Sequence, residues 1–163
     1  MDNITFELIA EKHLTDIMDI YNYYIRNTTA TFYSHEHTME NIKEFVYDGP
    51  RYKSFVIYYD GALAGYIMLK RHENCSEYDL TADIALYLKP DSTGKGIGGV
   101  AVRHIENAAK REGFHSLIAS ICTENQGSIR LFEKCGYVNC SHFKEVGWKF
   151  NRFLDNKDYQ KFI

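Results

Sequence analysis

The chain has few residues that could divide it. Its 163 residues include two prolines, Pro50 and Pro90, with no stretch rich in glycine and serine and no internal repeat. Domain boundaries usually fall in linkers rich in such residues, so residues 1–163 are expected to form a single domain. The length is typical of one domain and is enough to bury a sizeable core.

Basic runs and long apolar runs are also missing. The net charge is −3, with acids and bases interspersed, whereas a domain that binds nucleic acid normally has a basic patch. No apolar run approaches the roughly 20 residues that span a bilayer. The opening stretch MDNITFEL lacks the basic start and apolar core of a secretion signal. These absences predict a soluble, cytoplasmic protein with neither nucleic acid nor a membrane as a partner.

Disulfides and metal sites have little support in the sequence. Four cysteines occur without any C-x-x-C pair, namely Cys75, Cys122, Cys135 and Cys140. Reduced thiols are therefore expected. His35 and His37 could begin a metal site, but no cysteine or aspartate lies at ligand spacing, so no metal is expected. Aromatic residues are abundant instead, and thirteen tyrosines and ten phenylalanines favour an aromatic-lined interior or cleft.

Hydrophobic periodicity divides the chain into strands and helices. Period-two alternation in ITFELIA predicts a strand, and Asp60-Gly61 between two apolar runs predicts a hairpin. The expected strands are 4–10, 52–59, 62–70, 78–90, 114–123 and two within 137–163, and the expected helices are 14–27, 39–46, 96–112 and 125–135. This order predicts an α+β domain around a mainly antiparallel sheet, with one β-α-β crossover.

The crossover contains the glycine-rich stretch STGKGIGG, residues 92–99. Glycines let the backbone turn its N–H groups inward, and the positive end of a helix dipole begins just beyond them, which favours a phosphate. A flexible strand-to-helix turn is the alternative, but four glycines in six positions favour the functional interpretation.

Three kinds of phosphate fit this stretch to different degrees. Gly94, Gly96 and Gly99 match G-x-G-x-x-G, yet in a dinucleotide fold the first glycine ends a strand, and here KPDST intervenes. Glu124 lies near where a ribose-binding acid would fall, so this alternative stays open. A nucleotide triphosphate loop needs Gly-Lys-Ser/Thr at its end, which is lacking. The pyrophosphate of coenzyme A fits best.

Several stretches resemble a known family in the same order along the chain. ALYLKPDSTGKGIGG, GFHSLIAS and ENQGSIRLFEKCGY resemble the GCN5-related N-acetyltransferases (GNAT). IYNYYIRNTTATF and EVGWKFNRFLD resemble the phosphinothricin and methionine-sulfoximine acetyltransferase branch. The resemblance implies the GNAT fold: a mixed, mostly antiparallel sheet of about seven strands flanked by four helices, with a splayed parallel pair at the acetyl-CoA site.

The resemblance also implies an acetyl-CoA site. The pyrophosphate would lie on the backbone of Gly94, Lys95, Gly96, Ile97, Gly98 and Gly99. The pantetheine would pair with the backbone of Leu86, Tyr87 and Leu88, and the Leu88 N–H would act as the oxyanion donor. Asn125 and Ser128 match the family's pantetheine contacts. Capping of the helix that follows is a structural alternative for Asn125.

The catalytic base that the resemblance implies is Asp83, where the family usually has glutamate. Because aspartate is one methylene shorter, a bridging water is expected between it and the amine. Thr93 stands where an arginine or glutamine is usual, and Lys95 is expected to compensate. Phe132 replaces a tyrosine or histidine that could protonate the thiolate. Tyr137 is a nearby candidate for that role, although a core position is favoured.

The acceptor site is expected to hold a small amine. Phe32 and Tyr78 would help to wall it in this branch, beside Asp83. Cys75 stands where the branch has an arginine that binds the acid group of phosphinothricin, and Lys70 and Arg71 lie further back. His35 replaces an acidic residue. An amino-acid-like substrate is predicted.

The sequence thus predicts a cytoplasmic acetyl-CoA-dependent N-acetyltransferase that transfers acetyl directly to a small primary amine of the phosphinothricin or methionine sulfoximine/sulfone type. A non-catalytic acyl-CoA sensor and a protein N-terminal or lysine acetyltransferase remain alternatives. An acyl-cysteine on Cys122 is disfavoured, because no activating base is visible. A homodimer is expected, and Trp148 and its aromatic neighbours are expected to pack the closing strands or a subunit interface.

Overall fold

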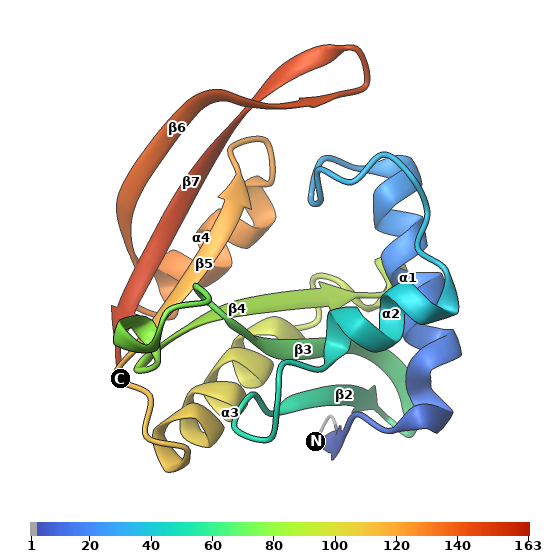
Figure 1. Cartoon of the computed structure of the whole chain (residues 1–163). Coiled ribbons are helices and arrows are strands. Elements are labelled where there is room, and N and C mark those ends of the chain that lie inside the picture. The colour runs from blue at the N-terminus through green and yellow to red at the C-terminus, as the bar shows by residue number, and fades with distance from the viewer. Residues whose placement is uncertain (1–2) are drawn as a thin grey trace.

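The computed structural model describes residues 3–163, which form a seven-stranded sheet with helices on both faces (Figure 1). The strands are β1 (Ile4–Leu8), β2 (Ser54–Tyr59), β3 (Ala62–Arg71), β4 (Thr81–Leu88), β5 (Ser116–Cys122), β6 (Val138–Lys149) and β7 (Arg152–Phe162). The helices are α1 (Leu14–Asn27), α2 (Met39–Val46), α3 (Ile97–Arg111) and α4 (Gln126–Lys134). The strand order is β1-β2-β3-β4-β5-β7-β6, and all pairs are antiparallel except β4-β5. The expected seven strands, four helices and single parallel pair are confirmed.

Local sequence signals account for most element boundaries. The β2-β3 hairpin turns at Asp60 and Gly61, whose φ angles of 48° and 82° suit a tight two-residue turn. Thr38 caps α2 by accepting the Asn41 N–H on its side chain. The expected strand 78–90 is shorter than predicted, because short 3₁₀ turns occupy Ser76–Tyr78 and Pro90–Ser92.

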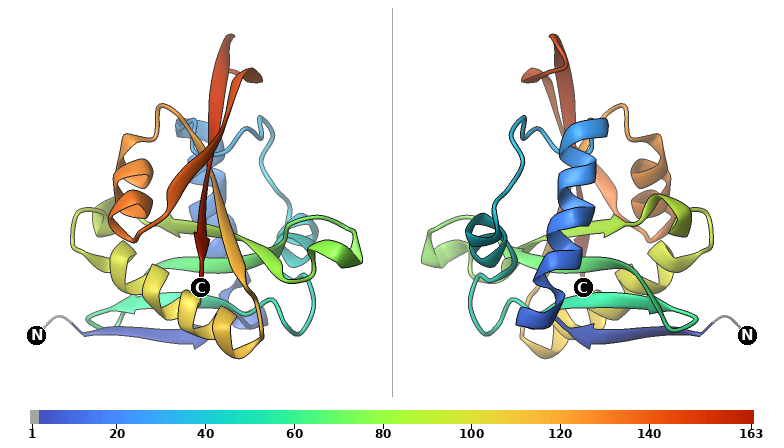
Figure 2. Two further views of the ribbon diagram at one scale, coloured as in Figure 1. Left: turned by 90° about the vertical axis from the view of Figure 1, so that its left-hand side faces the viewer. Right: turned by 90° about the vertical axis from the view of Figure 1, so that its right-hand side faces the viewer.

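Two hydrophobic cores lie on opposite faces of the sheet. One packs α3 and α4 against β3, β4 and β5, with Ile105, Leu117 and Phe132 among its members. The other packs α1 and α2 against β2 and β3, through side chains such as Ile17 and Tyr66. Figure 2 shows α3 and α4 on one side of the sheet and α1 and α2 on the other. Residues of β4 alternate between these cores, so one strand takes part in both.

The parallel pair separates soon after it begins. β4 pairs with β5 only where Thr81–Asp83 lies beside Ser116–Ile118. Beyond that point the strands diverge, and Figure 1 shows them as the two arms of a V. The splayed pair is confirmed, and it leaves the second half of β4 without a strand partner on the β5 side.

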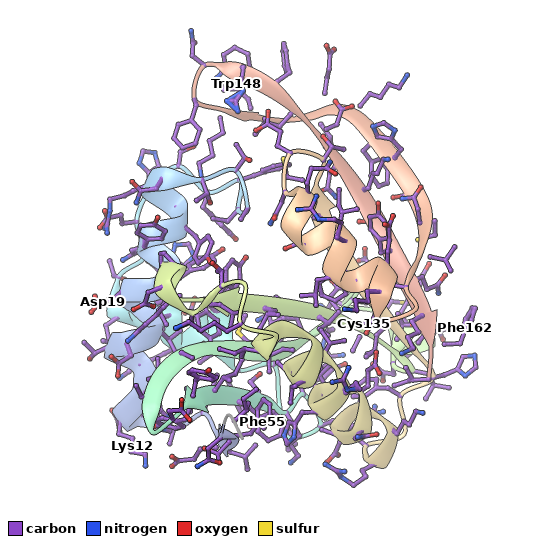
Figure 3. All side chains as sticks on the ribbon, turned by 180° about the vertical axis from the view of Figure 1, so that it is seen from behind. Lys12, Asp19, Phe55, Cys135, Trp148 and Phe162 are labelled. Carbon is purple, nitrogen blue, oxygen red and sulfur yellow. The ribbon has the colours of Figure 1, made fainter. Side chains whose placement is uncertain are left out.

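β6 and β7 form a long hairpin that rises beyond the sheet (Figure 1). Its outer part bends over toward the C-terminal end of α1. Trp148, labelled in Figure 3, lies in this outer part of the hairpin. Trp148 is 54% exposed and meets Phe153 edge to face, with 4.7 Å between the ring centres.

No helix among residues 3–163 is both long and apolar enough to cross a membrane.

Candidate active site

The gap between the diverging strands opens into a cavity of about 530 Å³. Strand β4, the glycine loop, β5 and the start of α4 line it, together with Tyr24 from α1. Most residues expected at the acetyl-CoA site lie in this lining, namely Leu86, Tyr87, Leu88, Gly94, Gly96, Gly98, Gly99, Asn125 and Ser128. These residues come from β4, the glycine loop and the start of α4, and the fold brings them to one cavity.

The glycine loop leads directly into the N-terminus of α3. Gly94 and Gly96 have φ angles of 75° and 77°, a backbone conformation that side chains with a Cβ rarely adopt. Gly96 precedes α3 directly, so the first N–H groups of a 15-residue helix point toward the cavity mouth. Such an end favours an anion.

Strand β4 presents its free backbone edge to the cavity. The Lys89 N–H donates to the Ala64 carbonyl of β3 at 2.7 Å. Because neighbouring residues of a strand point their N–H groups to opposite edges, the Leu88 N–H faces the gap. The Leu88 carbonyl, on that same edge, accepts the Tyr24 hydroxyl at 2.5 Å. This geometry leaves the Leu88 N–H open to the cavity, and its oxyanion role stays a prediction.

Asp83 stands where the two strands part. Its carboxylate oxygen lies 2.7 Å from His72 Nδ1, and both side chains are partly exposed. Burial raises the pKa of Asp83, and the His72 hydrogen bond opposes that shift. A carboxylate with a raised pKa is a better proton acceptor than an ordinary one. Its neighbours Ile84 and Ala85 line the cavity, so the strand carries Asp83 to the edge of that space.

Residues 17–137 match the acetyltransferase (GNAT) family. The chain belongs to the GNAT acetyltransferases. Members of this family use acetyl-CoA, which when bound supplies an activated acetyl thioester. The cavity suits this group, because two glycines of positive φ, a helix N-terminus and an unpaired strand edge all line it. No three potential metal-ligating side chains gather anywhere in residues 3–163.

Individual relatives extend over almost the whole chain. Phosphinothricin N-acetyltransferase of Streptomyces coelicolor is 28% identical over 93% of this chain and 92% of its own. L-methionine sulfoximine/L-methionine sulfone acetyltransferase of Salmonella typhimurium is 27% identical over 85% of this chain and 82% of its own. A crystal structure of the Sinorhizobium meliloti phosphinothricin acetyltransferase with AcCoA has a TM-score of 0.93 at 25% identity, covering 98% of this chain and 88% of the other.

Within this GNAT fold, the side chains of two residues expected in the pyrophosphate loop, Lys95 and Ile97, do not line the cavity. Lys95 Nζ lies 5.3 Å from the centre of the Tyr59 ring. Ile97 is 1% exposed and belongs to the core. Their backbone remains part of the loop, but the Lys95 side chain does not replace the cation missing at Thr93, which lines the cavity.

Neither Phe32 nor Tyr78, the aromatic residues expected at the amine site, belongs to the cavity lining. Tyr78 is 50% exposed, and its ring centre lies 5.7 Å from that of His72, the partner of Asp83. Phe32 packs on the hairpin, where an added Cβ at Gly147 would come within 2.5 Å of its ring. Phe32 and Tyr78 thus remain predictions as walls of the amine site.

The residues considered as a proton donor, an acyl-cysteine or a metal ligand each pack against other parts of the fold. Phe132 is buried in the cavity lining. Tyr137 packs edge to face on it, and burial raises the tyrosine pKa, which makes the hydroxyl a poorer proton donor. Cys122 is 3% exposed, and all four cysteines are free. The His37 ring packs edge to face on Tyr21.

Lys149 is a residue that sequence reasoning missed. It is 3% exposed, and its ammonium donates to the Thr28 carbonyl at 2.8 Å and to the Thr31 carbonyl at 2.7 Å. Burial lowers the pKa of Lys149. The contact ties the β6-β7 hairpin to the loop between α1 and α2, which contains Phe32. A second tie is made by Glu124, which accepts from Arg152 at 2.6 Å and from Thr29 at 3.1 Å.

Replacing Lys149 by methionine should loosen that loop. The variant keeps the apolar stem but leaves two backbone carbonyls without their donor, which should lower the free energy of unfolding by about 2 kcal/mol. The KM for the amine should rise more than the KM for acetyl-CoA, because the loop contains Phe32, which is expected to wall the amine-binding site. Chemical denaturation and steady-state kinetics measure both effects. Lys144→Met, at an exposed position of the same strand, is the control, and equal behaviour of the two variants would contradict the bracing role.

Proposed function

We propose that the protein transfers the acetyl group of acetyl-CoA directly to the primary amine of a small, amino-acid-like substrate. The observation that carries this proposal is the position of Asp83 at the point where β4 leaves β5. From there the strand leads along one cavity to the open Leu88 N–H and the glycine loop. The named activities of the relatives from Streptomyces and Salmonella support this substrate class.

The residues divide the chemistry among them. Asp83, directly or through a water, takes a proton from the ammonium or from the attacking nitrogen. The Leu88 N–H donates to the carbonyl oxygen, on which negative charge develops as the C–N bond forms. The C–S bond then breaks and the electron pair leaves with sulfur. Phe132 cannot donate a proton, so coenzyme A leaves as the thiolate and takes its proton from water.

Only a neutral amine can attack the thioester, so the pKa of the acceptor ammonium determines how much the catalytic base must contribute. The α-amino group at a chain terminus has a reference pKa of about 7.7–8.0 and a lysine ammonium has one of about 10.4. The carboxylate of a free amino acid places the pKa of its α-ammonium between these two values, so it requires less assistance than a lysine side chain. An α-amine therefore suits a single carboxylate base. This consideration supports an amino-acid-like acceptor over a lysine side chain of a protein.

The decisive experiment measures thiol release from acetyl-CoA across amino acids, their sulfone and sulfoximine analogues, and whole peptides. Turnover with free amines is the expected result. Tight acetyl-CoA binding with no thiol released against any amine would instead identify a sensor. Release with peptides but not with free amino acids would identify a protein acetyltransferase.

Asn125 offers a test that separates cofactor binding from helix capping. Its side-chain oxygen accepts the Ser128 N–H at 3.2 Å, so it caps α4. Asn125→Asp keeps an equivalent cap but removes the amide donor beside the pantetheine. The KM for acetyl-CoA should rise about tenfold, which corresponds to one lost hydrogen bond, with little change in melting temperature. An unchanged KM would assign Asn125 to capping alone, and Asn125→Ala should lower the melting temperature in either case.

The assembly proposed is a cytoplasmic, single-domain chain that pairs into a homodimer through the β6-β7 hairpin. Trp148, Phe153 and Val146 leave a large apolar surface exposed on that hairpin. A monomer of 19.0 kDa in light scattering would rule the dimer out.

A further inference from the structure

His72 is brought to Asp83 by the pairing of β3 with β4. Lys70 lies directly opposite Asp83 in this antiparallel register, and Arg71 lies opposite Ala82. His72 is the next residue along the chain, so its side chain is directed to the same face as those of Lys70 and Asp83. A diagonal neighbour of this kind is within reach of an aromatic side chain. The His72 ring spans that distance, and its Nδ1 lies 2.7 Å from Asp83 Oδ1.

This hydrogen bond occupies one of the two carboxylate oxygens of Asp83. The ionised carboxylate can only accept, so His72 Nδ1 carries the proton and donates it. Asp83 has no other hydrogen-bond or ion-pair partner within residues 3–163. Lys70, which lies directly opposite, pairs instead with Asp48 at 2.9 Å. His72 therefore fixes Oδ1 and leaves Oδ2 able to accept a proton from an amine or from a bridging water.

The ring of Tyr78 lies next to the ring of His72. The two ring centres are 5.7 Å apart, and the planes are inclined by 60°. Tyr78 ends the short 3₁₀ turn before β4, so the β3-β4 connection begins and ends at these two rings. Arg71 and Asp79, the neighbours in sequence, pair with each other at 3.1 Å and do not bond to Asp83. The hydrogen-bonded carboxylate thus stands beside the tyrosine expected to wall the amine site.

The charges around Asp83 make the bond from His72 important. Burial is the main cause that raises the pKa of Asp83, and the carboxylates of Asp158 and Glu73 also raise it. His72 opposes these three influences through its hydrogen bond and its charge. Without His72, more of the carboxyl would be protonated at a given pH, and a protonated carboxyl cannot take a proton from the amine.

We infer that His72 is the positioning residue of the proposed base: its Nδ1–H holds Asp83 Oδ1, leaves Oδ2 for the amine, and is not itself the proton acceptor. This inference rests on the proposed function, because it assigns a second residue to the same proton transfer. The amine proton passes to Asp83 Oδ2 while the bond from Nδ1 to Oδ1 stays intact. The proton then passes from Oδ2 to water, so the carboxylate is restored and His72 is unchanged.

Two substitutions at His72 separate a positioning role from a role as the base. His72→Asn keeps an N–H donor at about the place of Nδ1 but removes the imidazole. His72→Phe keeps a ring beside Tyr78 but removes the donor. In His72→Phe, kcat for thiol release should fall about 10–100-fold, the range for one hydrogen bond to a charged group. His72→Asn should stay within about threefold of the wild type, and neither variant should change the KM for acetyl-CoA.

The pH profile supplies a readout that a merely structural role would not move. Because His72 lowers the pKa of Asp83, loss of the donor in His72→Phe should move the acidic limb of kcat/KM to higher pH by about one unit. Carbon-13 titration of the Asp83 carboxyl measures the same shift without turnover. His142→Phe is the matched control, because His142 forms a similar pair with Asp155 at 2.8 Å on the β6-β7 hairpin, and it should change neither quantity.

The outcomes separate this inference from the function on which it rests. Equal loss of kcat in His72→Asn and His72→Phe would make His72 itself the proton acceptor and overturn the inference alone. An unchanged kcat with an unmoved acidic limb in His72→Phe would also overturn it. Absence of thiol release from the wild type with every amine overturns the proposed function as well. If His72→Phe does not fold by circular dichroism, His72→Leu removes the donor with a smaller side chain and takes its place.

Discussion

Replacing Asp83 by asparagine is expected to lower kcat/KM by about 10²–10⁴-fold, the usual contribution of a positioned general base. Asparagine is nearly isosteric and can still accept from His72 Nδ1, now 2.7 Å from the carboxylate, so the fold should persist. Thiol release measures the loss, and the melting temperature checks the fold. Asp19→Asn is the matched control, because Asp19 is an exposed aspartate on α1 (Figure 3).

The pH profile distinguishes a base from a merely structural carboxylate. Asp83 acts when ionised, and burial raises its pKa above the ordinary value, so activity should be lost as pH falls through that raised pKa. The substrate ammonium adds its own limb at higher pH. On a logarithmic plot the wild-type slope should therefore reach two at acidic pH, and Asp83→Asn should keep a slope of one. Full activity of the variant across the pH range would refute the assignment.

The sequence predicted the elements well, because they depend on local signals such as apolar periodicity and the Asp60-Gly61 turn. Most residues assigned to acetyl-CoA also line one cavity, and their roles there stay predictions. Leu88 and Asn125 followed from their place in a family pattern that runs along the chain. These features need no knowledge of how distant strands align.

The acceptor side was harder, because it depends on register and side-chain direction. His72 follows the last residue of β3 and reaches Asp83 through the β3-β4 register. Lys149 contacts Thr28, which lies 121 residues away in sequence. No periodicity or local motif specifies such contacts. The Lys95 side chain shows the same limit, since its partner Tyr59 comes from another strand.

Gly65 should be the position at which one added methyl group does the most harm. A Cβ there would lie 2.3 Å from the Tyr87 carbonyl oxygen and 2.8 Å from the Leu88 Cα, so it would meet backbone that cannot rotate away. Gly65→Ala should therefore push β4 off β3 and lower the free energy of unfolding by about 3 kcal/mol, at the upper end for overpacking. Denaturant titration measures this loss.

The same displacement should also damage catalysis, because Leu88 carries the proposed oxyanion donor. A shift of about 1 Å in a positioned group can cost about 10²-fold in rate, so kcat should fall by that order even at temperatures where Gly65→Ala remains folded. Ala62→Val adds two methyl groups at an exposed position of the same strand and should change neither stability nor kcat. A Gly65→Ala enzyme that loses stability yet keeps its kcat would show that the backbone of β4 at Leu88 does not stabilise the transition state.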